Sequence, residues 1–257
     1  MAHDAGLSEP PPTTTIHPTA VLGPGVELGV GVRIGPHAVL TGPLEVGDRV
    51  WIGAGSVIGA PPEVTSARMN LAWDGDLAHV GVVVEADVVV RELVVVHQGT
   101  RRPTRVGAGT WLLNRCYLAH DVVLGPGVVV SAGVSIGGHC TIGARANLGM
   151  NAAIHQRRVV GPGAMVGMCT PVTRDVPPFG LVHGSPLRLH DVNSYALTRA
   201  GHPPEVAAAL RAAYANTQDL TSVRADLGLA VLAEELTWWA ALEGLRPVRV
   251  ALDTADA

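Results

Sequence analysis

The chain of 257 residues contains no lysine, so all 18 of its basic residues are arginine. Its formal net charge of −4 argues against binding of nucleic acid or an anionic membrane surface through bulk positive charge. Aromatic residues make up only 4% of the chain, with a single phenylalanine, although 47% of the residues are hydrophobic. A core of Val, Ile, Leu and Ala favours regular, tightly stacked layers over an irregular globule.

The sequence also has few cysteines and no long apolar segment. Cys116, Cys140 and Cys169 form no C-x-x-C motif, which is typical of reduced thiols that pack as small hydrophobic side chains in a cytoplasmic protein. No apolar run reaches the length of a transmembrane helix, and residues 1–15 lack the basic start and apolar core of a secretory signal. We therefore expect a cytoplasmic protein with no membrane span and a disordered lead-in over residues 1–15.

What the sequence does have is a six-residue repeat. An aliphatic residue falls at every sixth position from Ile16 to Ile58, and glycine follows it in six of these eight units. The phase returns at Val88 and then runs unbroken from Val106 to Val172. This period suits a short strand plus a turn, and three such units close a triangular coil that stacks about 4.8 Å from the next. The repeat therefore predicts an all-β parallel β-helix.

Interruptions of the repeat define the expected domains. The prediction is a β-helix over residues 16–186, with loop insertions near 60–80 and 100–105, followed by a C-terminal α-helical domain over 187–257 that caps the open end. Within this cap, helical spacing is found over 202–220 and roughly 222–243. Loops that leave a rigid prism are natural carriers of binding groups, although a short one is as readily a tolerated excursion.

Several polar residues break the repeat and are candidates for a site. They are His97, Asn114, His120, Asp121, His139, His155 and Gln156. Because one coil takes 18 residues, His120 is expected about 5 Å from the backbone of Gly138 and His139. A lone histidine on such a surface is most often structural, but several histidines in adjacent coils favour a functional site.

Two chemistries compete for this histidine column. Imidazole can act as a general base near neutral pH, and the adjacent Asp121 could orient or polarise His120. The alternative is zinc held between histidines, as in the β-helical carbonic anhydrases. That family is expected to carry two histidines five residues apart, and this sequence has no such pair. We therefore expect general base catalysis and no metal.

Six runs of the sequence narrow the choice further. "IHPTAVLGPGV", "VVVHQGT", "LAHDVVLG", "GGHCTIG", "AIHQ" and "DVPPFGLVHGSP" resemble the UDP-N-acetylglucosamine O-acyltransferases of lipid A synthesis, which are hexapeptide-repeat acyltransferases. The resemblance extends from Ile16 into the cap. It implies a left-handed β-helix, where the general rule for parallel crossovers would give the opposite hand. It also implies a homotrimer with active sites between subunits.

The resemblance implies specific roles for residues of this chain. His120 corresponds to the general base and the Gly138 amide to the oxyanion donor, while the expected role of Asp121 beside the base rests on its adjacency to His120. The residues implied to bind substrate are His97, His139, His155, Gln156, Asn193 and Arg199. The implied reaction moves an acyl group, possibly 3-hydroxylated, from a phosphopantetheine thioester on acyl carrier protein, or on CoA, to a hydroxyl or amine of a UDP-amino sugar. It needs no bound cofactor.

The sequence departs from the family at the acceptor side. A family lysine that contacts the nucleotide sugar corresponds to Asp74, and a family histidine near the base corresponds to Tyr117. Both differences leave the acceptor open, and an acceptor of specialised metabolism is an alternative. The residues that could supply the missing cation are Arg68, Arg101, Arg102 and Arg105, although solvated surface charges explain them equally well.

Donor recognition gives two further expectations. The position that ends the family's acyl channel is glycine in members with longer acyl chains and methionine in some with shorter ones. It is Met168 here, which implies a medium-length or shorter acyl group, unless Met168 simply packs between coils. Arg188, Arg199 and Arg211 could form a basic patch for the acidic carrier protein. A non-catalytic β-helix scaffold is the remaining alternative, but it would not need four site residues at family spacing.

Overall fold

The computed structural model describes residues 13–65, 79–217, 219–225 and 228–252. The expected lead-in lies almost wholly outside these residues. Its boundary at residue 15 is slightly too late, because Thr15 already belongs to the first strand. Arg68 and Asp74 also lie outside the described residues.

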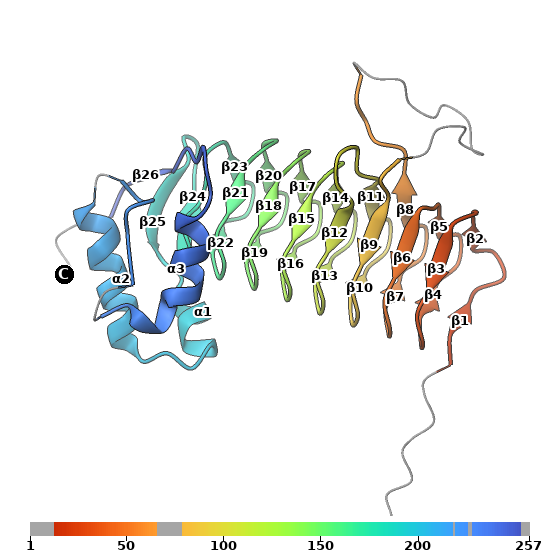
Figure 1. The fold of residues 1–257 in the computed structure, drawn as a ribbon, viewed down its shortest axis with the longest axis horizontal. Helices are drawn as coiled ribbons and strands as arrows, with labels where there is room; N and C mark the ends of the chain where they lie inside the picture. Colours follow the sequence, from red (N-terminus) through yellow and green to blue (C-terminus); the bar gives the residue numbers. More distant parts are fainter. Residues whose placement is uncertain (1–12, 66–78, 218, 226–227, 253–257) are drawn as a thin grey trace, which may run out of the picture.

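The repeat folds as a left-handed parallel β-helix of about nine turns, which confirms the predicted fold class (Figure 1). Its three faces are parallel sheets, named A, B and C here. Sheet A contains β1 (Thr15–Ile16), β4 (Arg33–Ile34), β7 (Trp51–Ile52), β10 (Val89–Val90), β13 (Trp111–Leu112), β16 (Val129–Val130), β19 (Asn147–Leu148) and β22 (Met165–Val166). Sheet B contains β2 (Val21–Leu22), β5 (Val39–Leu40), β8 (Val57–Ala60), β11 (Val95–His97), β14 (Tyr117–Leu118), β17 (Ser135–Ile136), β20 (Ala153–Ile154) and β23 (Pro171–Val172). Sheet C contains β3 (Val26–Leu28), β6 (Leu44–Val46), β9 (Val82–Val84), β12 (Thr104–Val106), β15 (Val123–Leu124), β18 (Thr141–Ile142) and β21 (Val159–Val160).

The register follows the 18-residue coil. Leu118 pairs with Ile136, which pairs with Ile154 on the next coil. These side chains point into the prism and are at most 3% exposed. The aliphatic ladder supplies the apolar burial that stabilises each coil against its neighbours.

The corners of the prism depend on a left-handed backbone. On the edge between sheets B and C, Asp121, His139 and Arg157 have φ values of 61°, 62° and 62°. We call this edge, formed by the turns 119–122, 137–140, 155–158 and 173–175, the B/C edge. The turns 113–116, 131–134, 149–152 and 167–170 form the A/B edge. Because equivalent turn residues recur every coil, side chains along one edge form a column.

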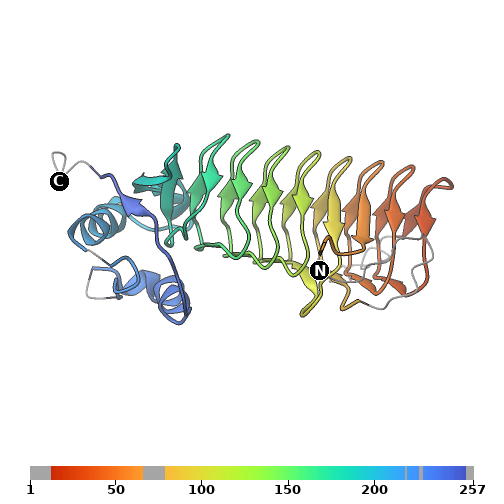
Figure 2. The same cartoon turned by 90° about the horizontal axis from the view of Figure 1, so that it is seen from above.

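The cap was expected to be α-helical, but it also contains strands. Sheet A continues through β24 (Gly180–His183), the antiparallel β25 (Arg188–Val192) and β26 (Arg249–Val250). The helices are α1 (Ser194–Arg199), α2 (Pro204–Asn216), the 3-10 turn η1 (Ala230–Leu232) and α3 (Ala233–Ala240). Figure 2 shows them gathered at the C-terminal end of the prism. The helix expected from about residue 222 starts later, with η1 at Ala230 and α3 at Ala233, and it is preceded by a turn in which the Asp219 carboxylate accepts the Thr221 N–H and hydroxyl.

The buried Asp175 carboxylate connects the last coil to the C-terminal segment by hydrogen bonds. Asp175 is 1% exposed and accepts hydrogen bonds from the Arg158 guanidinium and the Arg246 N–H. The Asp175 N–H in turn donates to the Arg246 carbonyl. These bonds tie the chain after α3 back onto the prism. No described helix is long and apolar enough to cross a membrane.

Candidate active site

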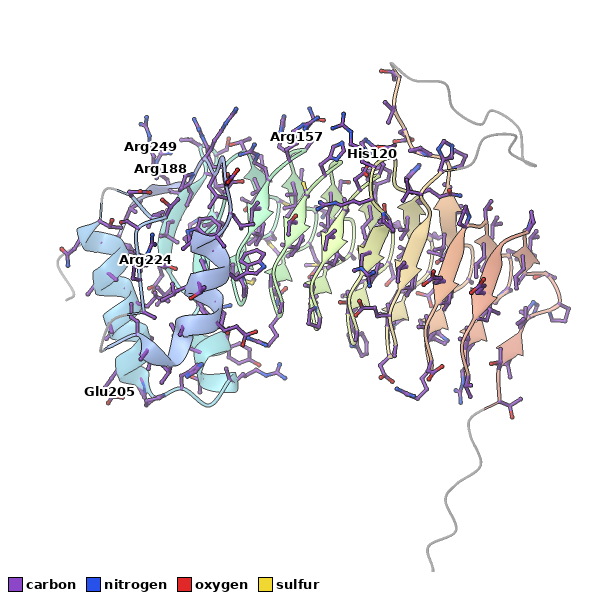
Figure 3. The ribbon with its side chains drawn as sticks, in the orientation of Figure 1. His120, Arg157, Arg188, Glu205, Arg224 and Arg249 are labelled. Atoms are coloured by element: carbon purple, nitrogen blue, oxygen red, sulfur yellow. The ribbon has the colours of Figure 1, made fainter. Side chains whose placement is uncertain are left out.

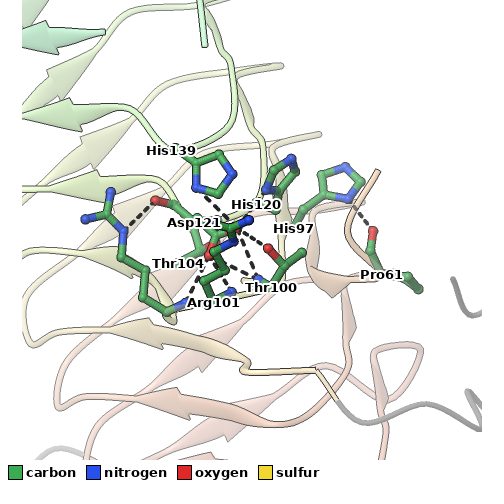
Figure 4. A network of polar contacts seen from close by, with 9 residues as sticks. Pro61, His97, Thr100, Arg101, Thr104, His120, Asp121 and His139 are labelled. Carbon is green, nitrogen blue, oxygen red and sulfur yellow. Dashed lines mark hydrogen bonds and ion pairs between the residues drawn. The ribbon is translucent and has the colours of Figure 1, made fainter. Parts of the chain in front are cut away.

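The candidate residues gather where the B/C edge is crossed by a short loop. Residues 100–103 leave the repeat between β11 and β12 and return at Thr104. His120, Asp121 and His139 lie on the two following coils, beside this loop (Figure 4). Figure 3 shows His120 on the same edge of the prism as Arg157.

Asp121 is the buried anchor of the cluster. Its side chain is fully buried and accepts hydrogen bonds from the Thr100 hydroxyl at 2.7 Å and from the Arg101 and Arg102 amides at 2.7 and 2.9 Å. The Thr100 N–H and His120 add two further donors. Burial alone would raise the pKa of Asp121, but the hydrogen bonds from Thr100, the two arginine amides and His120 outweigh it and hold the pKa well below its usual range. Asp121 is therefore ionised at neutral pH.

This anchor fixes the tautomer of His120. The distance from His120 Nδ1 to Asp121 Oδ2 is 2.7 Å, and an ionised carboxylate only accepts. Nδ1 therefore carries a proton and donates it, so that in the neutral imidazole the free lone pair is on Nε2. The contact between these neighbours, which sequence adjacency alone could not establish, is present.

Gly138 lies directly against the His120 ring, one coil along as the repeat predicts. A Cβ placed on Gly138 would be 2.6 Å from Cε1 and 2.7 Å from Nε2 of His120. Only glycine therefore leaves room for the imidazole in this position. In the part of the chain that the structure describes, no acceptor takes the Gly138 N–H.

His139 completes the cluster. Its ring meets that of His120 edge-on, with centroids 4.9 Å apart, and its Nδ1 lies 3.8 Å from Asp121 Oδ2. Burial lowers the pKa of His139. The Asp121 charge opposes this shift, while His120, Arg157 and Arg101 add to it. His139 is therefore neutral at pH 7.

His97 lies one coil before His120 and contacts the first insertion. Its Nδ1 is 2.6 Å from the Pro61 carbonyl, and its ring lies 5.2 Å from that of Tyr117. The Tyr117 hydroxyl donates to Glu63 at 2.6 Å. Burial, reinforced by the Glu63 carboxylate, raises the pKa of Tyr117. Tyr117 therefore stays protonated, and it holds residues 61–65 beside the cluster.

His155 and Gln156 continue the column one coil beyond Gly138. Both are exposed, and the backbone of Gly137 lies against that of Gln156. Asn114 does not belong to this column. It lies on the A/B edge, where its amide donates to Glu92 at 2.6 Å.

Asn193 and Arg199 are not beside the histidines within one chain. They belong to a groove of about 580 Å³ between α1 and the outer face of sheet A. Its polar and aromatic lining residues are Trp111, Arg145, Asn147, Phe179, Asn193, Tyr195 and Arg199. Asn193 also caps α1 and donates to the Gly163 carbonyl. The expected substrate-binding residues thus fall on two different faces of the prism.

Met168 does not pack between coils. It lies on the A/B edge and is 61% exposed, and Met150, which is 48% exposed, occupies the same turn position one coil earlier. The 18-residue spacing could have identified Met150 from the sequence. Cys169 on this edge is also exposed, unlike the buried Cys116 and Cys140. The expectation of three buried thiols was therefore wrong for Cys169.

Two other expectations need correction. Arg188, Arg199 and Arg211 do not form the basic patch that we expected. Arg211 is paired with Asp191 at 2.7 Å, and Arg199 faces the groove beside α1. Among the possible replacements for the family lysine, Arg105 is bound to Glu85 and Arg102 donates to the Asp121 carbonyl. Of the described ones, only Arg101 keeps its guanidinium available.

The donor atoms of the cluster do not suit a resident metal. One atom each of His120, Asp121 and His139 lies within 4.8 Å of the others. The Asp121 carboxylate, however, already accepts five hydrogen-bond donors. Two imidazoles would remain, whereas protein zinc sites use three or four side chains.

The comparison with known protein families and proteins points to an acyltransferase family. A family model described as UDP N-acetylglucosamine O-acyltransferase, domain 2, matches residues 175–236, and one for six bacterial transferase hexapeptides matches 103–138. The acyl-[acyl-carrier-protein]–UDP-N-acetylglucosamine O-acyltransferase of Halorhodospira halophila is 32% identical over 90% of this chain and 95% of its own. The enzyme of the same name from Syntrophobacter fumaroxidans is 35% identical over 76% of this chain and 74% of its own.

Solved structures share the fold. UDP-N-acetylglucosamine acyltransferase from Campylobacter jejuni superposes with a TM-score of 0.72 at 23% identity, over 92% of this chain and 99% of that one. The Arabidopsis enzyme gives 0.70 at 22% identity, over 93% and 99%. Because the Halorhodospira relative matches over almost its full length, the chain is an acyltransferase that belongs to the UDP-N-acetylglucosamine O-acyltransferase family.

Proposed function

We propose that this protein transfers an acyl group from acyl carrier protein to a sugar hydroxyl of UDP-N-acetylglucosamine, with His120 as the general base. The names of the relatives support the two substrates. One observation carries the mechanism: the His120 ring, oriented by a buried and ionised Asp121, lies against the backbone of Gly138. Acyl carrier protein and nucleotide sugars are cytoplasmic molecules, so the proposed reaction is cytoplasmic.

The proposed steps follow from the tautomer of His120. Nε2 takes the proton of the acceptor hydroxyl as its oxygen attacks the thioester carbonyl carbon. The carbonyl oxygen becomes an oxyanion, and the Gly138 N–H donates to it. When the tetrahedral intermediate collapses, the C–S bond breaks and the pantetheine thiolate takes the proton back from His120. Asp121 stabilises the imidazolium between these two transfers.

The expected substrate-binding residues lie in two separate groups, and this separation favours an oligomer. His120 lies on the B/C edge, whereas Asn193 and Arg199 line the groove on sheet A. One open prism face cannot enclose a substrate. We propose a homotrimer in which the groove of one subunit faces the histidine column of the next.

The proposed acyl group is short or medium in length. The outer face of sheet B separates the His120 corner from Met168 and Met150. The outward residues between these edges, Ser135 and Ala153, are small, and together they form a floor along which an acyl chain can extend. The exposed methionines then form the end of this path.

One observation favours an acceptor other than UDP-N-acetylglucosamine as the alternative. The position of the family histidine is occupied by Tyr117, whose hydroxyl is bound to Glu63 and is held protonated. A different sugar, or an amine in place of the hydroxyl, therefore belongs in the test, as does CoA in place of the carrier protein.

The test is mass spectrometry of products formed from a panel of acyl carrier proteins and acyl-CoAs with UDP-N-acetylglucosamine and related UDP-amino sugars. We expect the carrier-bound donor and UDP-N-acetylglucosamine to give an ester product. The His120→Ala variant should lower kcat by about 10²- to 10⁴-fold, the usual contribution of a general base. Equal turnover by wild type and His120→Ala would exclude the proposed mechanism.

A further inference from the structure

The two sides of the histidine cluster each carry an arginine that the proposed mechanism does not use. Arg101 and Arg157 are exposed, and neither guanidinium has a hydrogen bond or ion pair within the described ranges of the chain. Their neighbours are already engaged, since Arg102 donates to the Asp121 carbonyl and Arg158 to Asp175. We call Arg101 and Arg157 the arginine pair.

Backbone bonds fix the two members of the pair on either side of the cluster. The Arg101 N–H donates to Asp121 at 2.7 Å, which places Arg101 one coil before His120. The Arg157 N–H donates to the Gly138 carbonyl at 2.9 Å, which places Arg157 one coil beyond His139. Both positive charges contribute to the lowered pKa of His139. Figure 4 shows Arg101 beside Asp121, and Figure 3 shows Arg157 farther along the same edge.

No free carboxylate competes for these guanidinium groups among the described residues of the cluster. Asp121 is fully buried and accepts five donors. Glu63 is bound to Tyr117, and Asp175 is buried with Arg158. Two exposed and unpaired positive charges therefore flank the proposed base along the edge, in a chain whose net charge is −4.

We propose that the arginine pair binds a phosphate or diphosphate group of a substrate while its reacting end lies at His120. Arginine suits this task because its planar guanidinium gives two parallel hydrogen bonds to phosphate oxygens. The inference rests on the proposed function, in which both substrates carry phosphate: the nucleotide sugar as a diphosphate and the donor on phosphopantetheine. It also explains how a chain without lysine holds an anionic substrate at this site.

Binding measurements test the pair without relying on turnover. Titration calorimetry compares UDP with uridine, and phosphopantetheine with pantetheine, on wild type and on the double variant Arg101→Gln/Arg157→Gln. Arg115→Gln is the matched control, because Arg115 is also exposed with a φ of 61° but lies on the A/B edge. Arg157→Lys tests whether charge alone restores binding.

We expect the double variant to raise the Kd of one phosphorylated probe at least tenfold, with Arg115→Gln within twofold of wild type and Arg157→Lys intermediate. The probe that weakens identifies the source of the phosphate. The proposal is overturned if both phosphorylated probes bind the double variant as tightly as wild type, or if uridine and pantetheine weaken equally. Absence of acyl transfer would count against the proposed function alone, since these constants do not depend on it.

Discussion

At the scale of single residues, the candidate site is organised around one carboxylate whose side chain is fully buried. Asp121 uses five donors to stay ionised while fully buried. The same carboxylate sets the His120 tautomer. If the proposed mechanism holds, activity and local stability both depend on this residue, and both should respond to its replacement.

Asp121→Asn keeps the shape of the side chain but turns one acceptor into a donor that faces other donors. We expect a loss of about 1–3 kcal/mol in the free energy of unfolding, the usual cost of a buried unsatisfied group, together with a fall in kcat because the tautomer is no longer held. Urea unfolding and steady-state kinetics measure the two effects.

The pH dependence of stability gives the control for this variant. The pKa of Asp121 is lower in the folded than in the unfolded chain. The stabilisation of the fold by the ionised Asp121 is therefore complete above the pKa of aspartate in the unfolded chain, about 4, and is lost as the pH falls below that value. Asp121→Asn should remove this part of the acid destabilisation. An unchanged acid profile in the variant would contradict the assignment.

Gly138→Ala tests the close approach of backbone and imidazole. The added methyl group would collide with Cε1 and Nε2 of His120 and displace the ring. A shift of about 1 Å in a reacting group can cost about 10²-fold in rate, so we expect kcat to fall by that order while the fold remains. Gly23→Ala is the matched control, because its nearest neighbour would be an ordinary contact at 3.4 Å. Equal activity of both variants would argue against a role for this contact.

At the scale of elements, the repeat and the loops differ in how far the sequence predicts them. The 18-residue coil predicted that His120 and Gly138 would be neighbours, because the register of stacked coils is fixed by the buried ladders. The loop at residues 100–103 has no such register. The Arg101 and Arg102 amides reach the Asp121 carboxylate only because the loop follows one specific backbone path. The sequence of the loop does not reveal this path. The roles implied for His97, His155 and Gln156 came from the family resemblance, and they stay predictions.

The turns of the A/B edge carry the prediction on acyl length. Met168→Gly should open the end of the proposed acyl path and shift the preference toward longer donors, by about fourfold in kcat/KM per added methylene at about 0.8 kcal/mol each. Competition assays with donors of graded length measure the shift. Met168→Leu keeps the bulk and should keep the wild-type preference. If Met168→Gly retained the preference of wild type, the acyl chain would not end at this edge.

At the scale of the whole molecule, the expected contacts fall on two separate parts of the prism, with the histidine column on the B/C edge and Asn193 and Arg199 in the groove over sheet A. The cap explains why the sequence did not reveal this. Its strands β24 and β25 extend sheet A, and α1 follows directly, so Asn193 and Arg199 are placed over sheet A. Only the assembly can bring this groove to the His120 corner of another copy. The mass in solution should therefore be three times 26.6 kDa, measured by light scattering.

Complementation tests whether one site takes residues from two subunits. His120→Ala and Arg199→Ala should each be severely impaired as purified proteins. When the two chains are co-expressed and assemble at random, about one quarter of the interfaces pair an intact His120 with an intact Arg199 of the neighbour. We therefore expect about a quarter of the wild-type activity in the mixed assembly, and none of this recovery when the two variants are purified separately and combined without exchange. A co-expressed mixture no more active than the mean of its parents would place both residues in a site formed within one chain.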